Sequence, residues 1–337
     1  MKFKYFLGID VSKHTIDVSL CFTTKPEHFF HQKFSNNPSG FRSLLAWLKE
    51  QHVIIEEAFF LMEHTGSYTL ELCCFLEKHQ LAFALVSPLH LQRSIGLQRG
   101  KNDKVDAKRI AEYAYLHRHK LNPCKLPSSQ LLELKNLYAF RSRLVKTQTS
   151  LKQTLKELKA LAHLVNNKFI IKESEKQLEL IKKQIKEVQA QILIKIKERD
   201  ELKRQYDLLC SVPGVAMITA LAMILSTNNF TGFENSRKFA SYCGVAPFEH
   251  SSGKSIKGRT KTSSLANHQI KALLSNCATT AIQHDEELKS YFNRKIAEGK
   301  PKMVVINAIR AKIINRIFAT IKRETPFVVL RQYNKAA

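Results

Sequence analysis

Residues 3–12 read FKYFLGIDVS, an apolar run that predicts a β-strand and carries an acidic residue, Asp10, near its end. Two further strand-like runs follow after short polar turns, TIDVSLCF at 15–22 and EHFFHQKFS at 27–35. Asp17 occupies the middle of the second run, where we expect its side chain to face solvent. Three strand-like runs therefore come first in the sequence.

Helical and strand patterns then alternate. Asn37, Pro38 and Ser39 start a helix whose apolar residues share one face, and the strand AFFLME follows at 58–63. A helix over about 68–79, the strand AFALVS at 82–87 and a helix from about Asp103 complete the segment. The order β-β-β-α-β-α-β-α is that of the ribonuclease-H-like, or RuvC-like, α/β fold with a mixed sheet. We assign this fold to residues 1–127.

Residues 128–209 show no strand pattern. Leucine, isoleucine and valine recur at helical spacing, and we expect one break, at Asn166 and Asn167, with Lys195 and Arg199 interrupting the second apolar seam. Such a stripe is far more typical of packing than of a cofactor site. The segment is predicted to form a coiled coil or helical hairpin, used internally or for dimerisation.

Residues 210–337 are predicted to be mainly α-helical. They begin with SVPGVAMITALAMIL at 211–225, a Pro-Gly turn between apolar segments, and further helices are expected at 265–282, 284–297 and 301–322. The stretch HSSGKSIKGRTKTSS at 250–264 is too hydrophilic for a core. We expect it to be a loop, functional or disordered.

Charge and cysteine content narrow the class of protein. Lys and Arg total 54 against 29 Asp and Glu, a net charge of +25, which favours a polyanionic partner and above all nucleic acid. The seven cysteines form no C-x-x-C pair, and His117, His119 and Cys124 lack a fourth ligand for zinc. No apolar run is long enough to span a bilayer and no signal peptide is evident, so the cytoplasm is expected and no membrane partner.

Four acidic residues form the candidate site. Asp10 and Glu63 close two predicted strands, and Asp103 and Asp106 lie three residues apart on one face of a helix start. If the strands are neighbours, four carboxylates converge and need a hard cation such as Mg²⁺ (or Mn²⁺). Taken singly, Asp103 could be a helix N-cap, Asp106 a first-turn acid and Asp10 a turn residue. Taken together, in a basic chain, the four acids favour metal.

The same segments resemble a known family. GIDVSK (8–13), MEHTGSY (62–68) and KNDKVDAKRIAEY (101–113) resemble the three acidic motifs of the DEDD insertion-sequence transposase/recombinase family, which includes Piv-type DNA invertases. His64 stands where the family's second motif usually has alanine. The C-terminal segments SVPGVAMITALAMIL, FASYCGVAPFEHSSGKSIKG (239–258) and SSLANHQIKALL (263–274) are similar to later family motifs, with Ala216, Ala266 and Lys271 as departures.

The resemblance places the family's nucleophile on Ser252, next to Ser251. From composition alone both are ordinary loop residues. A basic run suited to phosphates follows, and with a further lysine it makes up the expected nucleic-acid contacts: Lys254, Lys257, Arg259, Lys261 and Lys271.

The resemblance also implies an activity: Mg²⁺-dependent DNA recombination by an insertion-sequence transposase, through a phosphoserine intermediate. Its implied partners are donor and target DNA and a guiding non-coding RNA. It implies a homodimer that assembles into a tetramer in the bacterial nucleoid. The alternatives are a RuvC-like metal nuclease or Holliday-junction resolvase that does not need Ser252, and a non-enzymatic nucleic-acid-binding protein.

Overall fold

The structure is a computed structural model that describes residues 3–64, 66–95, 102–252 and 256–328, without the side chains of 95, 250–252, 256, 257 and 259. The chain divides into two compact units, Met1–Leu126 and Pro127–Ala337. Among the described residues, no helix has both the length and the apolar character needed to cross a membrane.

The first unit is built on the expected mixed sheet. Its five strands are β1 (Tyr5–Val11), β2 (Thr15–Phe22), β3 (Lys25–Ser35), β4 (Ala58–Glu63) and β5 (Ala82–Val86), in the order β3-β2-β1-β4-β5. The first three pair antiparallel as a meander, whereas β4 runs parallel to both β1 and β5. The prediction of a mixed α/β sheet is confirmed.

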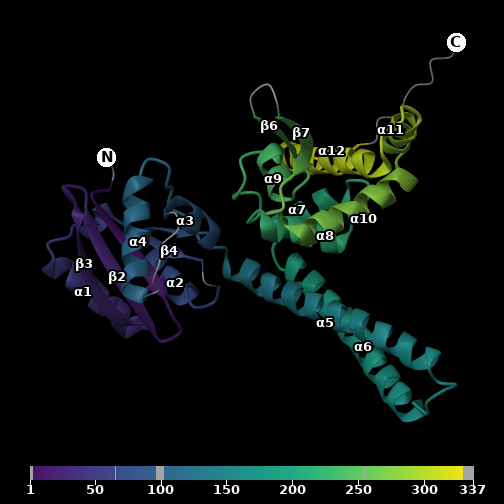
Figure 1. Ribbon diagram of the computed structural model, residues 1–337, viewed down its shortest axis with the longest axis horizontal. Helices are drawn as coiled ribbons and strands as arrows, with labels where there is room; N and C mark the ends of the chain where they lie inside the picture. The colour runs from purple at the N-terminus through teal and green to yellow at the C-terminus, as the bar shows by residue number, and fades with distance from the viewer. Residues whose placement is uncertain (1–2, 65, 96–101, 253–255, 329–337) are drawn as a thin grey trace. The chain divides into compact units, whose positions relative to one another are not determined.

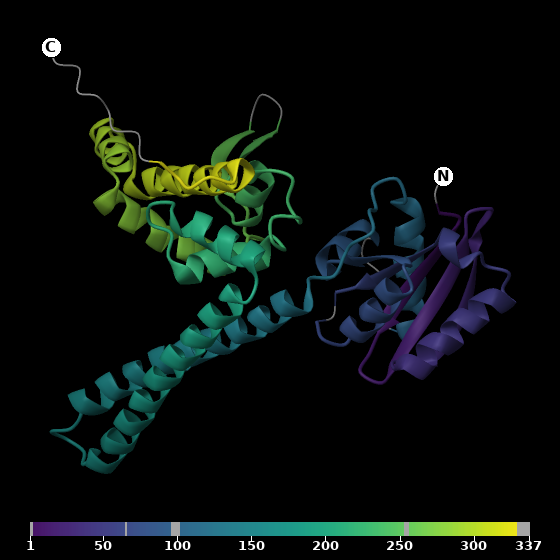
Figure 2. The same cartoon turned by 180° about the vertical axis from the view of Figure 1, so that it is seen from behind.

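Helices cover both faces of this sheet (Figures 1 and 2). Leu7 and Ile9 of β1 pack with α1 (Pro38–Glu50) and α2 (Leu70–Lys78), and a short 3-10 turn (Ile55–Glu57) precedes β4. Phe6, on the opposite face, packs with α3 (Pro88–Ile95) and α4 (Asp103–Leu116). Helix α3 was not predicted, because it is eight residues long and, among its described side chains, only that of Leu91 belongs to the core.

Gly8 lets α4 lie directly on β1. A Cβ atom at Gly8 would be 2.0 Å from the backbone nitrogen of Ala111 and 2.3 Å from the carbonyl oxygen of Ala107. Ser19, opposite Gly8 on β2, is also small and buried. Two small residues, Gly8 and Ser19, therefore lie under the middle of α4. Their close contact with the helix sets the position of its first turn relative to the ends of the strands.

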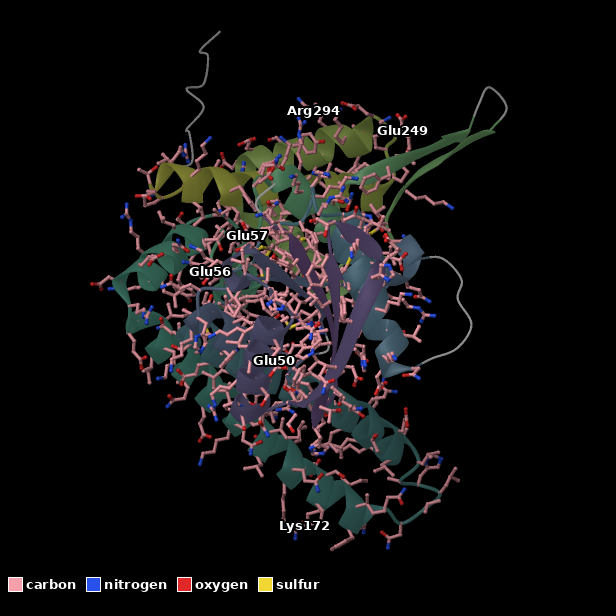
Figure 3. All side chains as sticks on the ribbon, turned by 90° about the vertical axis from the view of Figure 1, so that its left-hand side faces the viewer. Glu50, Glu56, Glu57, Lys172, Glu249 and Arg294 are labelled. Atoms are coloured by element: carbon pink, nitrogen blue, oxygen red, sulfur yellow. The ribbon has the colours of Figure 1, made fainter. Side chains whose placement is uncertain are left out.

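The second unit begins with a helical hairpin. Helices α5 (Ser129–Ala160) and α6 (Lys168–Lys197) lie side by side (Figures 1 and 2), joined by the expected turn at the asparagine pair. Leu155 and Ile192 are buried as the apolar spacing indicates, but Val165, expected in the seam, is 55% exposed because it lies in the turn itself. Polar side chains of the hairpin such as Lys172 point outward (Figure 3).

The expectation of an unbroken second helix to residue 209 is wrong. Helix α6 ends at Lys197, and α7 (Asp200–Cys210) begins after Arg199, whose backbone is extended at φ −131° and ψ 126°. Ile196 and Leu202, on either side of this break, both enter the same C-terminal core. Lys195 pairs with Glu133 of α5, so the residue expected to interrupt the seam instead links the two helices.

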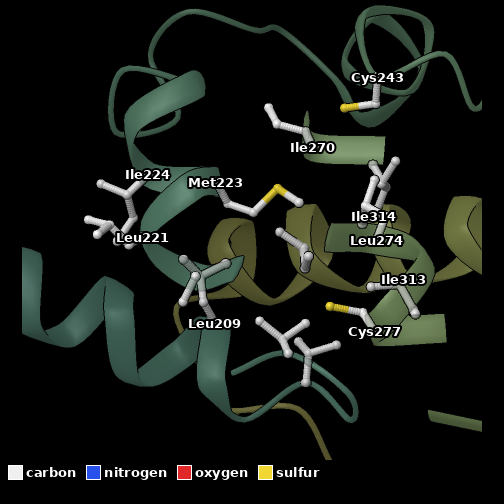
Figure 4. Packing of buried hydrophobic residues seen from close by; sticks show 14 of the residues in the cluster. Leu209, Leu221, Met223, Ile224, Cys243, Ile270, Leu274, Cys277, Ile313 and Ile314 are labelled. Carbon is white, nitrogen blue, oxygen red and sulfur yellow. The ribbon is translucent and has the colours of Figure 1, made fainter. Parts of the chain in front are cut away.

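The remaining elements form a helical domain around one apolar cluster (Figure 4). Its helices are α8 (Met217–Ser226), α9 (Ser236–Tyr242), α10 (His268–His284), α11 (Glu286–Ala297) and α12 (Lys302–Arg323). Gly214, in the predicted turn before α8, has a φ of +84° and lies against Cys277 of α10, where a Cβ would come within 2.4 Å of the Cys277 carbonyl oxygen. The mainly helical prediction agrees with these elements.

The hydrophilic stretch from residue 250 is largely strand in its described parts, 250–252 and 256–262. It contributes to an antiparallel hairpin of β6 (Pro247–Ser252) and β7 (Ile256–Thr262), in which Pro247 pairs with Thr262 and Ser252 with Ile256. Cross-strand hydrogen bonds satisfy the backbone of such a ribbon without burying its side chains, so the hydrophobic pattern gave no sign of it. The prediction of a loop here is corrected.

Candidate active site

The strand register brings the first two acids to one edge of the sheet. β1 and β4 are parallel neighbours, with Ile9 opposite Met62 as their last pair, so Asp10 and Glu63 follow at the same level. Glu63 is the last residue of β4, as predicted, and Asp10 precedes the last residue of β1. Residues paired in register direct their side chains to the same face, which here is the face covered by α4.

The second pair of acids lies in the first turn of α4. Asn102 is the N-cap, and its side-chain oxygen accepts a hydrogen bond from the backbone nitrogen of Lys104 at 3.0 Å. The alternative in which Asp103 caps the helix is therefore wrong. Asp103 is exposed, Asp106 is half-buried, and neither carboxylate is needed to satisfy the end of the helix.

Asp10 carries the electrostatic signature of the cluster. Burial raises the pKa of its carboxyl to about 6, and repulsion from Asp103, Asp106 and Glu63 adds to the shift, in that order. The other three predicted acids are therefore close enough to Asp10 to act on its carboxyl group. A carboxyl group that resists ionisation near neutral pH, inside a cluster of like charges, is typical of a functional site.

The cluster is not arranged as a ligand cage. Among the described residues, no three His, Cys, Asp or Glu side chains are grouped closely enough to hold a metal ion. Arg109, one turn beyond Asp106, donates from Nη1 to Asp106 Oδ1 at 2.8 Å. The donor chemistry nevertheless fits a hard divalent cation, because carboxylate oxygens are the ligands that such ions prefer and three acids already act on Asp10.

Asp17 does not face solvent, and this prediction is corrected. It lies directly opposite Asp10 across β1 and β2, is 5% exposed, and adds to the repulsion on Asp10. His31 Nε2 lies 2.9 Å from its Oδ1, and Lys33 Nζ 3.2 Å from its Oδ2. Both partners come from β3, so the carboxylate of Asp17 links β2 to the neighbouring strand. We therefore assign Asp17 a structural role and do not add it to the four candidate residues. Sequence reasoning missed it because alternation along one strand does not reveal cross-strand partners.

The candidate serine belongs to the other unit. Ser252 is the last residue of β6, but its side chain lies outside the described residues, as do the side chains of Lys257 and Arg259 and the whole of Lys254. Lys261 is exposed on β7. Lys271 of α10 is half-buried, and its Nζ lies 3.2 Å from Thr262 Oγ1 at the end of β7.

In comparison with known proteins, both units match family models of transposases. A family model for transposases of the DEDD IS110 kind matches residues 7–163, and the model of the transposase IS116/IS110/IS902 family matches residues 206–293. The first match contains all four acids, and the second contains Ser252.

Full-length relatives agree with these matches. The chain is 25% identical to the pilin gene-inverting protein of Moraxella bovis and 26% identical to that of Moraxella lacunata, over 96% of its own length and 98% of each relative. It is 26% identical to the transposase for insertion sequence element IS1111A of Coxiella burnetii, over 63% of its length and 65% of the relative.

Proposed function

The chain belongs to the IS110 family of transposases and is a DNA transposase or recombinase, and we propose that it moves or inverts DNA by serine attack on a phosphodiester. The observation that supports the proposal is the repulsion that Asp103, Asp106 and Glu63 exert on Asp10, because it is expected if the four family acids lie together. We further propose that the first unit is ribonuclease-H-like (RuvC-like), because an antiparallel meander continues into two parallel strands.

In this proposal Asp10, Glu63, Asp103 and Asp106 hold Mg²⁺ (or Mn²⁺). Bound there, a divalent ion would neutralise phosphate charge and stabilise the attacking and leaving oxygens of the displacement. Without such an ion, the four acids carry negative charge that nothing bound offsets. Their excess negative charge would repel a bare phosphate, and Arg109 at Asp106 offsets only part of it.

The proposed displacement uses Ser252 as nucleophile. A bond forms between its Oγ and phosphorus while one bond from phosphorus to a deoxyribose oxygen breaks, and the hydroxyl proton passes in net terms to that departing oxygen. The phosphoserine retains the phosphodiester's bond energy, so a second sugar hydroxyl can attack it and reseal the strand without an external energy source. Lys254, Lys257, Arg259, Lys261 and Lys271 would contact the flanking phosphates.

Assembly and guidance are extensions of the same proposal. The net charge of +25 supports binding of donor and target DNA together with a non-coding guide RNA. Large apolar side chains at the turn of the helical hairpin support self-association, first into a dimer and then into a tetramer. Leu164 is 71% exposed and Phe169 76% exposed, which is unusual for side chains of their size.

Incubation of the purified protein with nicked duplex DNA and Mg²⁺, with co-purified RNA retained, tests the chemistry. We expect a covalent protein–DNA adduct whose modified peptide maps to Ser252, and no adduct from the Ser252→Ala variant. Ser251→Ala is the matched control and should still form the adduct. Strand cleavage that persists in Ser252→Ala but disappears in Asp10→Ala would instead favour a RuvC-like nuclease or junction resolvase.

A further inference from the structure

Arg310, in the middle of α12, is a buried cation without a counter-ion. The residue is 5% exposed, and its Nη1 donates to Asn307 Oδ1 at 3.2 Å. In the described part of the chain its Nε has no hydrogen-bond partner, and no carboxylate lies within ion-pair distance of the guanidinium. Every Asp and Glu side chain of the sequence falls within that part, so none is hidden elsewhere.

The contrast with Arg316, six residues further along α12, shows how unusual this is. Arg316 donates to Asp285 at 2.7 Å and to Glu287 at 2.6 Å, so its charge is compensated twice. An arginine stays protonated under all ordinary conditions, and burying its charge without a partner costs free energy. Burial accordingly lowers the pKa of Arg310. A residue held at such a cost is expected to have an anionic ligand.

A second cation lies beside it. Burial, and then the charge of Arg310, lower the pKa of Lys271, so the two cations act on each other. Lys271 lies next to Gly244, because its Nζ would be 3.7 Å from a Cβ built there, an ordinary contact distance. Asn307, the partner of Arg310, donates from Nδ2 to the next carbonyl, that of Val245, at 2.8 Å. Both cations are therefore fixed at the Gly244–Val245 turn.

This turn leads directly into the hairpin that carries Ser252. Strand β6 begins at Pro247, which pairs with Thr262, and the Thr262 hydroxyl is hydrogen-bonded to Lys271. From Pro247 to Ser252 there are five strand steps, at most about 17 Å. Along one DNA strand that distance corresponds to about five base-pair rises, so a phosphate bound at the turn belongs to the same DNA segment as one at Ser252.

We propose that Lys271 and Arg310 form a binding site for one DNA phosphate at the base of the β6–β7 hairpin. Lys271, half-buried, contacts the phosphate, and Arg310 supports it from the buried side, where low polarity strengthens its attraction. Asn307 and Thr262 hold the two cations in place. The inference rests on the proposed function, which takes the polyanion to be DNA and Lys271 to contact a phosphate, and it adds Arg310 and the fixed position of the pair.

The test compares full-length variants for binding to a short synthetic DNA duplex of arbitrary sequence over a series of salt concentrations. Lys271→Met should reduce the slope of log K against log salt by about one, because one phosphate contact is lost. Arg310→Met should weaken binding by at least about threefold. The two effects should be non-additive in the double variant, because both act on the same phosphate.

Thermal unfolding without DNA separates a ligand site from a structural role. Arg310→Met should leave the unfolding midpoint unchanged or raise it, because an uncompensated buried charge is removed. Arg316→Met, the matched control on the same helix, should lower the midpoint and leave DNA affinity unchanged. If Arg310→Met does not fold, Arg310→Lys and Lys271→Met still test the site, since the first should keep the salt slope and the second should reduce it.

Several outcomes would overturn the inference. Unchanged DNA affinity and salt slope in both Lys271→Met and Arg310→Met would show that no phosphate binds there. A change seen with a single-stranded RNA probe but not with the duplex would assign the site to RNA. A wild-type protein that failed to bind duplex DNA at all would instead contradict the proposed function, which keeps the two failures distinct.

Discussion

Asp10 shows why a candidate metal-binding residue can be costly to the fold. It is half-buried on the α4 face of the sheet, and three other carboxylates act on it together with Asp17. Every one of these influences opposes its ionisation. A protein selected for stability alone would place a neutral residue there, so the cluster is best explained by a positively charged ligand that the acids share.

The pH dependence of stability tests this account. Because the pKa of Asp10 in the folded protein, about 6, lies above its ordinary value of 3.8, the folded state holds this proton more tightly than the unfolded chain. That contribution to the free energy of unfolding is complete below pH 3.8 and is lost as pH rises through 6. In chelator, Asp10→Asn should therefore be more stable than wild type at pH 7 by chemical denaturation, with the difference vanishing toward acid pH.

Glu50, exposed on α1 and labelled in Figure 3, provides the control: Glu50→Gln should keep the wild-type pH profile. Addition of Mg²⁺ at pH 7 should raise the unfolding midpoint of wild type and not of Asp10→Asn, since a ligand stabilises the state that binds it. An Asp10→Asn protein that is less stable than wild type at pH 7 in chelator would contradict the repulsive cluster.

At the residue scale, the four acids could be proposed from the sequence alone, because the proposal depends only on their residue types and their positions at strand ends and a helix start. The sequence did not reveal the surroundings of Asp17, since Lys33 and His31 are brought to it by a register that only the paired strands define. It also missed Arg310, which looks like one more basic residue of a basic chain until its burial is known.

At the scale of elements, the contact between α4 and β1 decides whether the acids meet. Gly8→Ala places a Cβ 2.0 Å from the Ala111 nitrogen, which only a shift of backbone can relieve. We expect a loss of about 1–3 kcal/mol in unfolding free energy, as for other overpacked sites, and a lower DNA-recombining activity because the start of α4 moves away from Asp10. Denaturant unfolding and the adduct assay measure the two effects.

Ser19→Ala is the matched control, because Ser19 lies opposite Gly8 under the same helix. Its buried Oγ has no hydrogen-bond partner among the described residues, so its removal should be neutral or stabilising, by up to about 1 kcal/mol. Equal stability of Gly8→Ala and wild type would show that α4 is not held by this close approach.

Helices and strands could be predicted where the apolar spacing continues over enough residues to form a pattern. The sheet, α1, α10 and α12 follow from such patterns, whereas α3 is too short to show one. The end of α6 at Lys197 could not be read from the apolar repeat, because Ile196 and Leu202 keep the expected character and only the extended backbone at Arg199 separates them. The β6–β7 hairpin has few apolar residues in its sequence, so no apolar period marks it.

At the scale of the whole molecule, the proposed chemistry divides between two units that fold around separate cores. The acids belong to Met1–Leu126 and Ser252 to Pro127–Ala337, and each unit has its own apolar clusters. A single amino-acid change in one unit should therefore leave the other intact. Asp10→Asn and Ser252→Ala each remove one half of the proposed site and preserve the other.

Mixing these two inactive variants tests whether the halves combine between subunits. If the acids of one subunit act with Ser252 of another, a mixed dimer contains one complete site and one site that lacks both halves, so the mixture should form the covalent DNA adduct that neither variant forms alone. The adduct should map to the Asp10→Asn chain, which retains Ser252, and mass labelling of one variant identifies that chain. A mixture as inactive as its components, in conditions where exchange of labelled subunits is demonstrated, would require both halves to act within one chain.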